Sequence, residues 1–182
     1  MSVLIVTGTG TDVGKTVATA ALAACAKGRV AVVKPAQTGV ADGAPGDLAE
    51  VRRLSKVQDV HEFVRYPDPL SPHHAARLSG RPELRLADAV QRIVDLDALH
   101  DLVIVEGAGG LLVPFANDDR WTLVDLATRC NLADLAGMGP IAGVLPAGLP
   151  AMRDFGKAAR AALVRSFGGR FDWPAFLAAH RP

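Results

Sequence analysis

Residues 3–17 read Val-Leu-Ile-Val-Thr-Gly-Thr-Gly-Thr-Asp-Val-Gly-Lys-Thr-Val. The first four residues predict a buried strand, the closely spaced glycines predict a loop, and Lys15 and Thr16 begin an apolar helix. This order is typical of a phosphate-binding P-loop, where backbone N–H groups and a helix N-terminus surround an anion. Lys15 would reach the β- and γ-phosphates and the Thr16 hydroxyl would bind Mg²⁺. The loop is a variant, because Thr9 stands where the strict pattern has its first glycine.

The rest of the chain alternates apolar runs with stretches of helical spacing. Pro35 is expected to end the second strand because it lacks an N–H, and residues 60–72 are expected to be irregular because they contain three prolines. We predict a single α/β domain over residues 1–182, with a mostly parallel, P-loop NTPase-like sheet and helices on both faces. The predicted strands are 3–6, 29–33, 102–105 and 141–145, with a short extended piece at 111–115; the predicted helices are 16–26, 47–54, 73–78, 86–96, 123–135, 151–166 and 173–180.

Composition restricts the classes of function. The chain has 182 residues, of which 49% are hydrophobic, and a net charge of +1, which argues against broad binding of nucleic acid. Its two cysteines, Cys25 and Cys130, form no disulfide framework. The N-terminus does not resemble a signal peptide, and no apolar stretch has the length of a membrane span. We expect a cytoplasmic protein that binds neither nucleic acid nor membranes.

Polar residues follow the predicted strands at the edge where parallel sheets bind ligands. Glu106 follows an apolar run and suits a Mg²⁺ ligand beside the P-loop, although a solvated residue at a strand end is the alternative. Lys34 suits an anionic substrate or a phosphoryl group, with a surface lysine as the alternative. Asp47 fits a helix N-cap, with Glu50 completing a capping box. His73 and His74 lack partners at metal-site spacing.

Three motifs together resemble the ATP-dependent dethiobiotin synthetases. They are Val6–Thr16 around the P-loop, Val32-Val33-Lys34-Pro35-Ala36-Gln37-Thr38-Gly39, and Val103-Ile104-Val105-Glu106-Gly107-Ala108-Gly109-Gly110. Four shorter stretches are also similar: Tyr66-Pro67, Ser71-Pro72-His73, Val144–Gly148 and Phe167–Asp172. The resemblance covers about residues 1–126 and 128–172.

The resemblance implies an activity and a set of site residues. The family carboxylates 7,8-diaminononanoate with CO₂, phosphorylates the carbamate with Mg-ATP to a carbamic-phosphoric anhydride, and closes the ring of dethiobiotin. Lys15 and Lys34 are the implied catalytic residues, Thr11 and Thr38 the implied substrate contacts, and the family implies a homodimer. The implied Mg²⁺ ligands are Thr16, Asp47 and Glu106. The implied nucleotide-binding residues are Asp12, Val13, Gly14, Lys15, Thr16, Val17, Asp47, Glu106, Gly107, Ala108, Gly109, Leu145, Pro146 and Ala147.

One departure from the family lies between Leu126 and Asn131. By resemblance, some fifty to sixty residues are missing there, including two strands and a turn that binds the substrate carboxylate from the partner subunit. The P-loop strand would then lose a sheet neighbour and expose an edge. The alternatives to a ligase are therefore an internally deleted, weakly active or inactive nucleotide-binding remnant, or another P-loop ATPase of the same group. If full activity persists, Phe115–Trp121 is the stretch expected to replace the missing turn.

Overall fold

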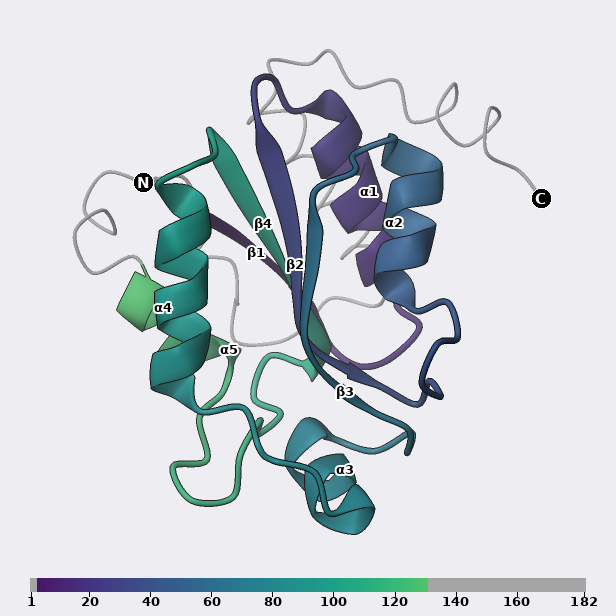
Figure 1. Cartoon of the computed structure of the whole chain (residues 1–182), viewed down its shortest axis with the longest axis vertical. Coiled ribbons are helices and arrows are strands. Elements are labelled where there is room, and N and C mark those ends of the chain that lie inside the picture. The colour runs from purple at the N-terminus through teal and green to yellow at the C-terminus, as the bar shows by residue number, and fades with distance from the viewer. Residues whose placement is uncertain (1–2, 131–182) are drawn as a thin grey trace. The chain divides into compact units, whose positions relative to one another are not determined.

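The structure is a computed structural model that describes residues 3–130, which fall within the first of two units, Met1–Leu132 and Ala133–Pro182. Four strands form one parallel sheet in the order β1-β4-β2-β3 (Figure 1). They are β1 Val3–Gly8, β2 Val30–Thr38, β3 Val60–Tyr66 and β4 Leu102–Gly110. The elements predicted at 141–145, 151–166 and 173–180 lie outside the described residues, and one domain over the whole chain stays a prediction.

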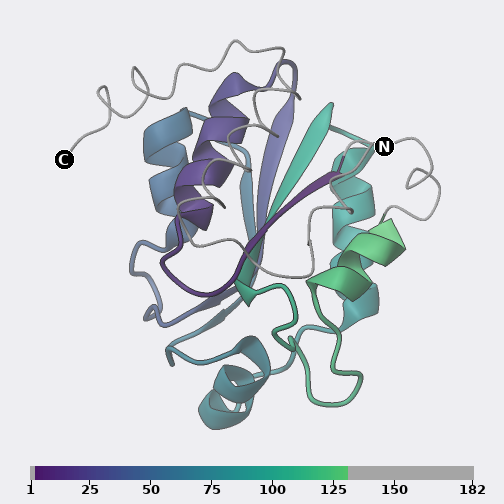
Figure 2. The same cartoon turned by 180° about the vertical axis from the view of Figure 1, so that it is seen from behind.

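Helices cover both faces of this sheet. The first face carries α1 Lys15–Cys25 and α2 Asp47–Ser55, and the second carries α4 Leu86–Asp97 and α5 Leu123–Cys130 (Figures 1 and 2). The remaining helix, α3 Pro72–Ser79, lies at the carboxyl ends of the strands. The prediction of a parallel α/β sheet of the P-loop type with helices on both faces is confirmed.

Strand alternation decides which face each side chain enters. Val33, Val103 and Val105 belong to the buried cluster under α4 and α5, where they pack with Ile93 and Leu126 among others. The intervening strand residues, including Val32 and Ile104, are also fully buried and face α1 and α2. Lys34 and Glu106 follow the same alternation and therefore emerge on the α1 and α2 face.

Two expectations about strands were wrong. Residues 60–66 form β3, because the three prolines of the 60–72 stretch all follow Tyr66 and leave Val60, His61 and Val64 free to pair with β2. The strand β2 continues past Pro35 to Thr38. The pairing of β2 with β4 ends at Val33. The missing N–H of Pro35 therefore costs no hydrogen bond to β4.

The end of β4 also differs from expectation. This strand runs through Glu106 to Gly110, where Gly8 still pairs with Gly110, instead of giving way to a loop after Val105. Leu111–Phe115 is not extended, because a turn follows Gly110 and Val113 N–H donates to the Gly110 carbonyl at 3.2 Å.

The sheet divides at its carboxyl end. The last paired residues of β2 and β4 are Val33 and Val105. Beyond them β2 stays with β3 as far as Thr38, and β4 stays with β1 as far as Gly110. Lys34 and Glu106 are the first residues after the division, so the fold brings them face to face where the strands separate.

Candidate active site

The P-loop connects β1 to α1 and presents the start of that helix. Gly14 is the N-cap, with φ of +95°, a left-handed conformation that favours glycine, and it has no side-chain cap. The N–H groups of the first turn are thus available for an anion. Lys15 is buried, and its Nζ donates across the loop to the Gly10 carbonyl at 2.5 Å. The ammonium therefore points into the loop, as the P-loop interpretation requires.

The electrostatics of Lys15 favour the arrival of an anion. Burial lowers the pKa of Lys15 below its ordinary value, and the neighbouring charge of Lys34 lowers it further. Glu106, Asp47 and Asp12 act in the opposite direction without reversing the shift. A bound phosphate would stabilise the protonated ammonium, which burial disfavours.

A second group of charges gathers around Lys34, which is 3% exposed. Its Nζ lies 2.5 Å from Asp47 Oδ2 and 3.0 Å from Glu106 Oε1, and it donates to the Gly107 carbonyl at 3.1 Å. Three acceptors satisfy the three N–H donors of the ammonium. Thr16 Oγ1 donates to the same Glu106 oxygen at 2.9 Å, which joins the P-loop helix to this cluster.

The oxygens of this cluster suit a small hard cation. Glu106 is fully buried, and its Oε2 has no hydrogen-bond partner among the described residues. The carboxylates of Asp47 and Glu106 both contact the Lys34 ammonium, and the Thr16 hydroxyl contacts Glu106. Magnesium is typically bound by one or two carboxylates, with phosphate oxygens and water completing the octahedron. Residues 3–130 contain no group of three or more His, Cys, Asp or Glu arranged for a metal.

The prediction that Asp47 caps its helix was wrong. The helix α2 begins at Asp47 itself, and its N-cap is Gly46, without a side-chain cap. The Asp47 N–H is bound by Gln37 Oε1 at 2.9 Å, and Glu50 pairs with Arg53 instead of forming a capping box. The Asp47 carboxylate is consequently not used as a helix cap, and it forms an ion pair with Lys34.

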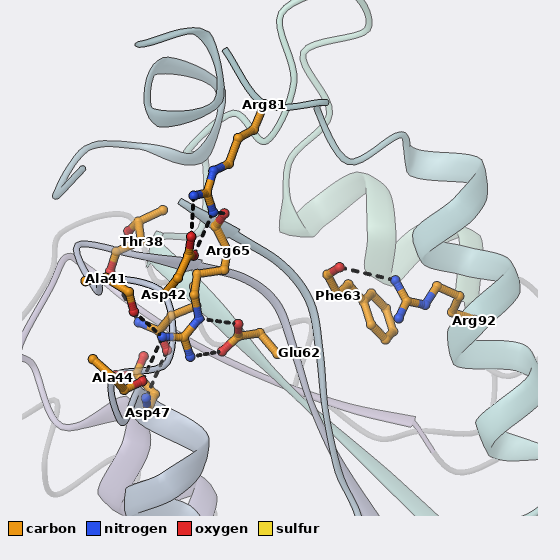
Figure 3. A network of polar contacts seen from close by, with 11 residues as sticks. Thr38, Ala41, Asp42, Ala44, Asp47, Glu62, Phe63, Arg65, Arg81 and Arg92 are labelled. Atoms are coloured by element: carbon orange, nitrogen blue, oxygen red, sulfur yellow. Dashed lines mark hydrogen bonds and ion pairs between the residues drawn. The ribbon is translucent and has the colours of Figure 1, made fainter. Parts of the chain in front are cut away.

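The loop between β2 and α2 is held by arginines (Figure 3). Arg65 on β3 donates to the carbonyls of Ala41 and Ala44 and forms a bidentate pair with Glu62. Arg81 forms a bidentate pair with Asp42 and also donates to the Arg65 carbonyl. These contacts fix the loop that leads into Asp47.

The structure brings together five of the predicted site residues and leaves the roles of others open. Lys15, Thr16, Lys34, Asp47 and Glu106 form the site described above. The remaining predicted residues lie nearby in the chain: Thr11, Asp12 and Val13 are exposed in the P-loop, Val17 and Thr38 are half-buried, and Gly107, Ala108 and Gly109 end β4. Leu145, Pro146 and Ala147 lie outside the described residues.

Sequence reasoning missed Gln37 and Arg65 at this site. Gln37 lies within the Val32–Gly39 motif, and its position three residues after Lys34 could have indicated that it belongs to the site. Arg65 gave no signal, because it falls in a stretch that was expected to be irregular. His73 Nδ1 forms a hydrogen bond with the Pro114 carbonyl, and His74 Nδ1 forms one with the Ser71 hydroxyl.

No helix within residues 3–130 combines the length and apolar character needed to cross a membrane.

Comparisons with known proteins show which family this chain resembles. Residues 2–133 match a protein-family model described as an AAA domain. A Rhodococcus jostii (strain RHA1) protein is 65% identical over 148 residues, which cover 78% of this chain but only 64% of that protein, less than two thirds of its length. A Saccharopolyspora erythraea protein is 44% identical over 225 residues, covering 94% of this chain and all of the relative. Both relatives are named ATP-dependent dethiobiotin synthetase BioD.

The longer alignments show that this chain is shorter than its relatives. A Streptomyces avermitilis protein of the same name is 40% identical over 240 positions, with both chains covered completely. Because this chain has 182 residues, at least 58 of those positions have no counterpart in it. The size agrees with the fifty to sixty residues expected to be missing. The place of the gap, between Leu126 and Asn131, stays a prediction.

Proposed function

Because the chain belongs to the ATP-dependent dethiobiotin synthetase family, we propose that it binds Mg-ATP and transfers a phosphoryl group to the carbamate of 7,8-diaminononanoate and CO₂. Ring closure of the resulting carbamic-phosphoric anhydride would yield dethiobiotin. The observation that carries the proposal is the convergence of Lys34, Asp47, Glu106 and Thr16 beside the P-loop.

Each residue has a role that its contacts support. The first-turn N–H groups of α1 and the Lys15 ammonium would bind the phosphates. Thr16, Asp47 and Glu106 would hold Mg²⁺, which supplies charge neutralisation on the phosphate oxygens when bound. Asp12, Val13, Gly14 and Val17 would line the phosphates from the loop and helix, and Gly107, Ala108 and Gly109 from the end of β4.

Lys34 would act on the developing charge of the transferred group. In the structure its ammonium is satisfied by Asp47 Oδ2, Glu106 Oε1 and the Gly107 carbonyl. With Asp47 and Glu106 holding a divalent cation, the Lys34 donors would be available to the carbamate or phosphoryl oxygens. Such preorganised charge in a buried site is commonly the largest contribution to catalysis.

The remaining assignments follow from the family alone. Thr11 and Thr38 would contact the diamino acid, and Leu145, Pro146 and Ala147 would lie by the adenine or ribose. We also propose a homodimer in the cytoplasm, acting on small molecules and on neither nucleic acids nor membranes.

A second candidate is a nucleotide-binding protein with weak or no ligase activity. It is favoured by the 58 or more positions of the Streptomyces relative that have no counterpart here. The phosphate-binding groups are all present, whereas the family places a substrate carboxylate site in the segment expected to be missing. Each lost hydrogen bond in a buried site costs about 1–3 kcal/mol.

Two measurements on the full chain distinguish these candidates. Calorimetry would give the affinities for Mg-ATP and for 7,8-diaminononanoate, and a coupled assay would give dethiobiotin formed per ADP released. The ligase predicts stoichiometric dethiobiotin, and the second candidate predicts ordinary Mg-ATP affinity with diamino acid binding weakened by orders of magnitude. Lys15→Ala should lose about 10²–10³-fold in turnover. Near-normal turnover in that variant would contradict the P-loop assignment.

A further inference from the structure

Gln37, a side chain outside the proposed catalytic set, binds the start of α2. It is 3% exposed and lies on β2, three residues after Lys34, where its Oε1 accepts the Asp47 N–H at 2.9 Å. Its Nε2 donates to the Thr38 carbonyl at 3.2 Å, which fixes the orientation of the amide. The N-cap Gly46 has no side chain, and Gln37 satisfies one of the N–H groups at the helix start that have no partner within the helix.

Arg65 holds the loop on the other side of this helix start. One nitrogen, Nη1, donates to the carbonyls of Ala41 at 2.9 Å and Ala44 at 2.8 Å (Figure 3). Nε and Nη2 bind the two oxygens of Glu62 at 2.7 and 2.8 Å. A guanidinium has five donors in a rigid plane, whereas a lysine cannot make these four contacts together. The loop is therefore attached to β3 by an arginine that is itself locked in place.

Gly46 shows how closely the two side chains approach the helix start. A Cβ added to Gly46 would lie 2.6 Å from Gln37 Oε1 and 3.2 Å from Arg65 Nη2. The φ of Gly46 is −104°, which any residue adopts. Glycine is required here by close packing and not by backbone conformation.

We propose that Gln37 and Arg65 are positioning residues, which hold the Asp47 carboxylate where it can bind the divalent cation of the nucleotide complex. The inference rests on the proposed function. Asp47 is the first residue of α2 and directly follows the loop that Arg65 holds, whereas Thr16 lies in α1 and Glu106 in β4. Magnesium requires near-ideal octahedral distances, so a displaced carboxylate loses affinity. Residues that orient metal ligands typically contribute 10–100-fold to affinity.

The test compares matched variants by Mn²⁺ affinity, measured by electron paramagnetic resonance with a saturating non-hydrolysable ATP analogue. Arg65→Gln and Gln37→Met remove the contacts, Gly46→Ala displaces the Gln37 amide without removing any polar group, and Asp47→Asn removes the carboxylate. Arg53→Gln is the control, because Arg53 also forms a bidentate pair with a glutamate three residues away, Glu50, on the exposed surface of α2. Calorimetry in EDTA gives nucleotide affinity without metal.

We expect Mn²⁺ affinity to fall about 10–100-fold in Arg65→Gln, Gln37→Met and Gly46→Ala, with metal-free nucleotide affinity and Arg53→Gln unchanged. If Asp47→Asn weakens Mn²⁺ binding while the three positioning variants do not, this inference is overturned and the proposed function stands. If Asp47→Asn itself binds Mn²⁺ normally, the proposed metal site is wrong. A parallel loss of metal-free nucleotide binding would show general damage to the fold and would also overturn the inference.

Discussion

Among individual side chains, Glu106 has the most constrained environment. It is fully buried, and Lys34 and Thr16 both donate to its Oε1. A buried carboxylate that loses its cationic partner costs about 3–5 kcal/mol, whereas replacing both members of such a pair is often neutral. The Lys34–Glu106 pair therefore links stability to the proposed chemistry.

We predict that Lys34→Met lowers the free energy of unfolding by about 3–5 kcal/mol, because it leaves Glu106 without its ammonium. Adding Glu106→Gln should recover most of this loss while leaving turnover abolished. Urea denaturation of the parent, both single variants and the double variant measures the coupling. Additive losses in the double variant would show that the two side chains do not act as a buried pair.

The raised pKa of the Cys130 thiol leads us to predict that the free energy of unfolding depends on pH. Burial, followed by the nearby Asp97, raises the pKa of Cys130 from 9.0 to about 11. Below pH 9 the thiol is protonated in both states and contributes nothing to the pH dependence. Between pH 9 and 11 the unfolded chain loses this proton and the folded protein keeps it, so the free energy of unfolding falls as the pH rises, by at most about 1.4 kcal/mol per unit.

Cys130→Ala should flatten this alkaline slope. Burial also raises the pKa of Tyr66 and acts in the same direction, so the informative quantity is the difference between the variant and the parent. Identical slopes from pH 8 to 10.5, measured by urea denaturation at each pH, would contradict the assignment to Cys130.

At the level of helices and strands, the segment after β4 is held by its aromatic residues. Phe115 and Trp121 are buried and stacked with ring centroids 4.3 Å apart, and Phe115 N–H donates to the Trp121 carbonyl. Trp121 Nε1 donates to the Leu84 carbonyl at 2.8 Å. Both aromatic side chains are thus occupied by the core, while residues 117–120 between them are exposed, and the replacement of the missing turn by Phe115–Trp121 stays a prediction.

We predict that Trp121→Phe lowers the free energy of unfolding by about 1–3 kcal/mol, because the buried Leu84 carbonyl loses its donor. Nucleotide affinity should stay unchanged, since the P-loop is built from other elements. Leu112→Ala in the same segment is the control, with an expected change within about 0.5 kcal/mol, because Leu112 is 73% exposed. Equal stability of Trp121→Phe and the parent, by urea denaturation, would contradict the role of this hydrogen bond.

The sequence predicted the strands β1, β2 and β4 and the P-loop because apolar runs and glycines are local signals. It could not predict that β2 passes Pro35, since this depends on where β4 stops pairing. The proximity of Lys34 and Glu106 was predictable, because each directly follows an apolar run and parallel strands bring such positions to the same edge of a sheet. The contacts of Asp47 were not, because the Gln37 acceptor and the Arg65 contacts come from β2 and β3 and depend on the folded register.

Taken as one body, residues 3–130 leave an unpaired sheet edge. In this part of the chain β1 pairs with β4 alone, and the expectation that the P-loop strand lacks a neighbour in the whole chain stays a prediction. An apolar strand with one free edge is a site for pairing with another chain. Amides that point to the free edge have no partner within residues 3–130, and those that point to β4 are bonded.

We predict two exchange classes within β1. In dilute solution, amide hydrogens on its free edge should exchange on the order of 100-fold faster than those bonded to β4, measured residue by residue with NMR. Protection of both classes would mean that a segment beyond residue 130 or a second copy covers the edge. Repeating the measurement at high protein concentration separates these two cases, because only a second copy gives concentration-dependent protection.

The division of the sheet at Val33 and Val105 has a consequence for recombination between relatives. One branch, β1 with β4, carries the P-loop and Glu106, while the other, β2 with β3, carries Lys34, Gln37 and Arg65. A chimera that takes β2 through β3 from another family member exchanges one whole branch and cuts the chain only between elements. Such a chimera must still match the host along the paired residues Val30–Val33 of β2, where α2 packs on α1, and at the contact between Lys34 and Glu106 across the division.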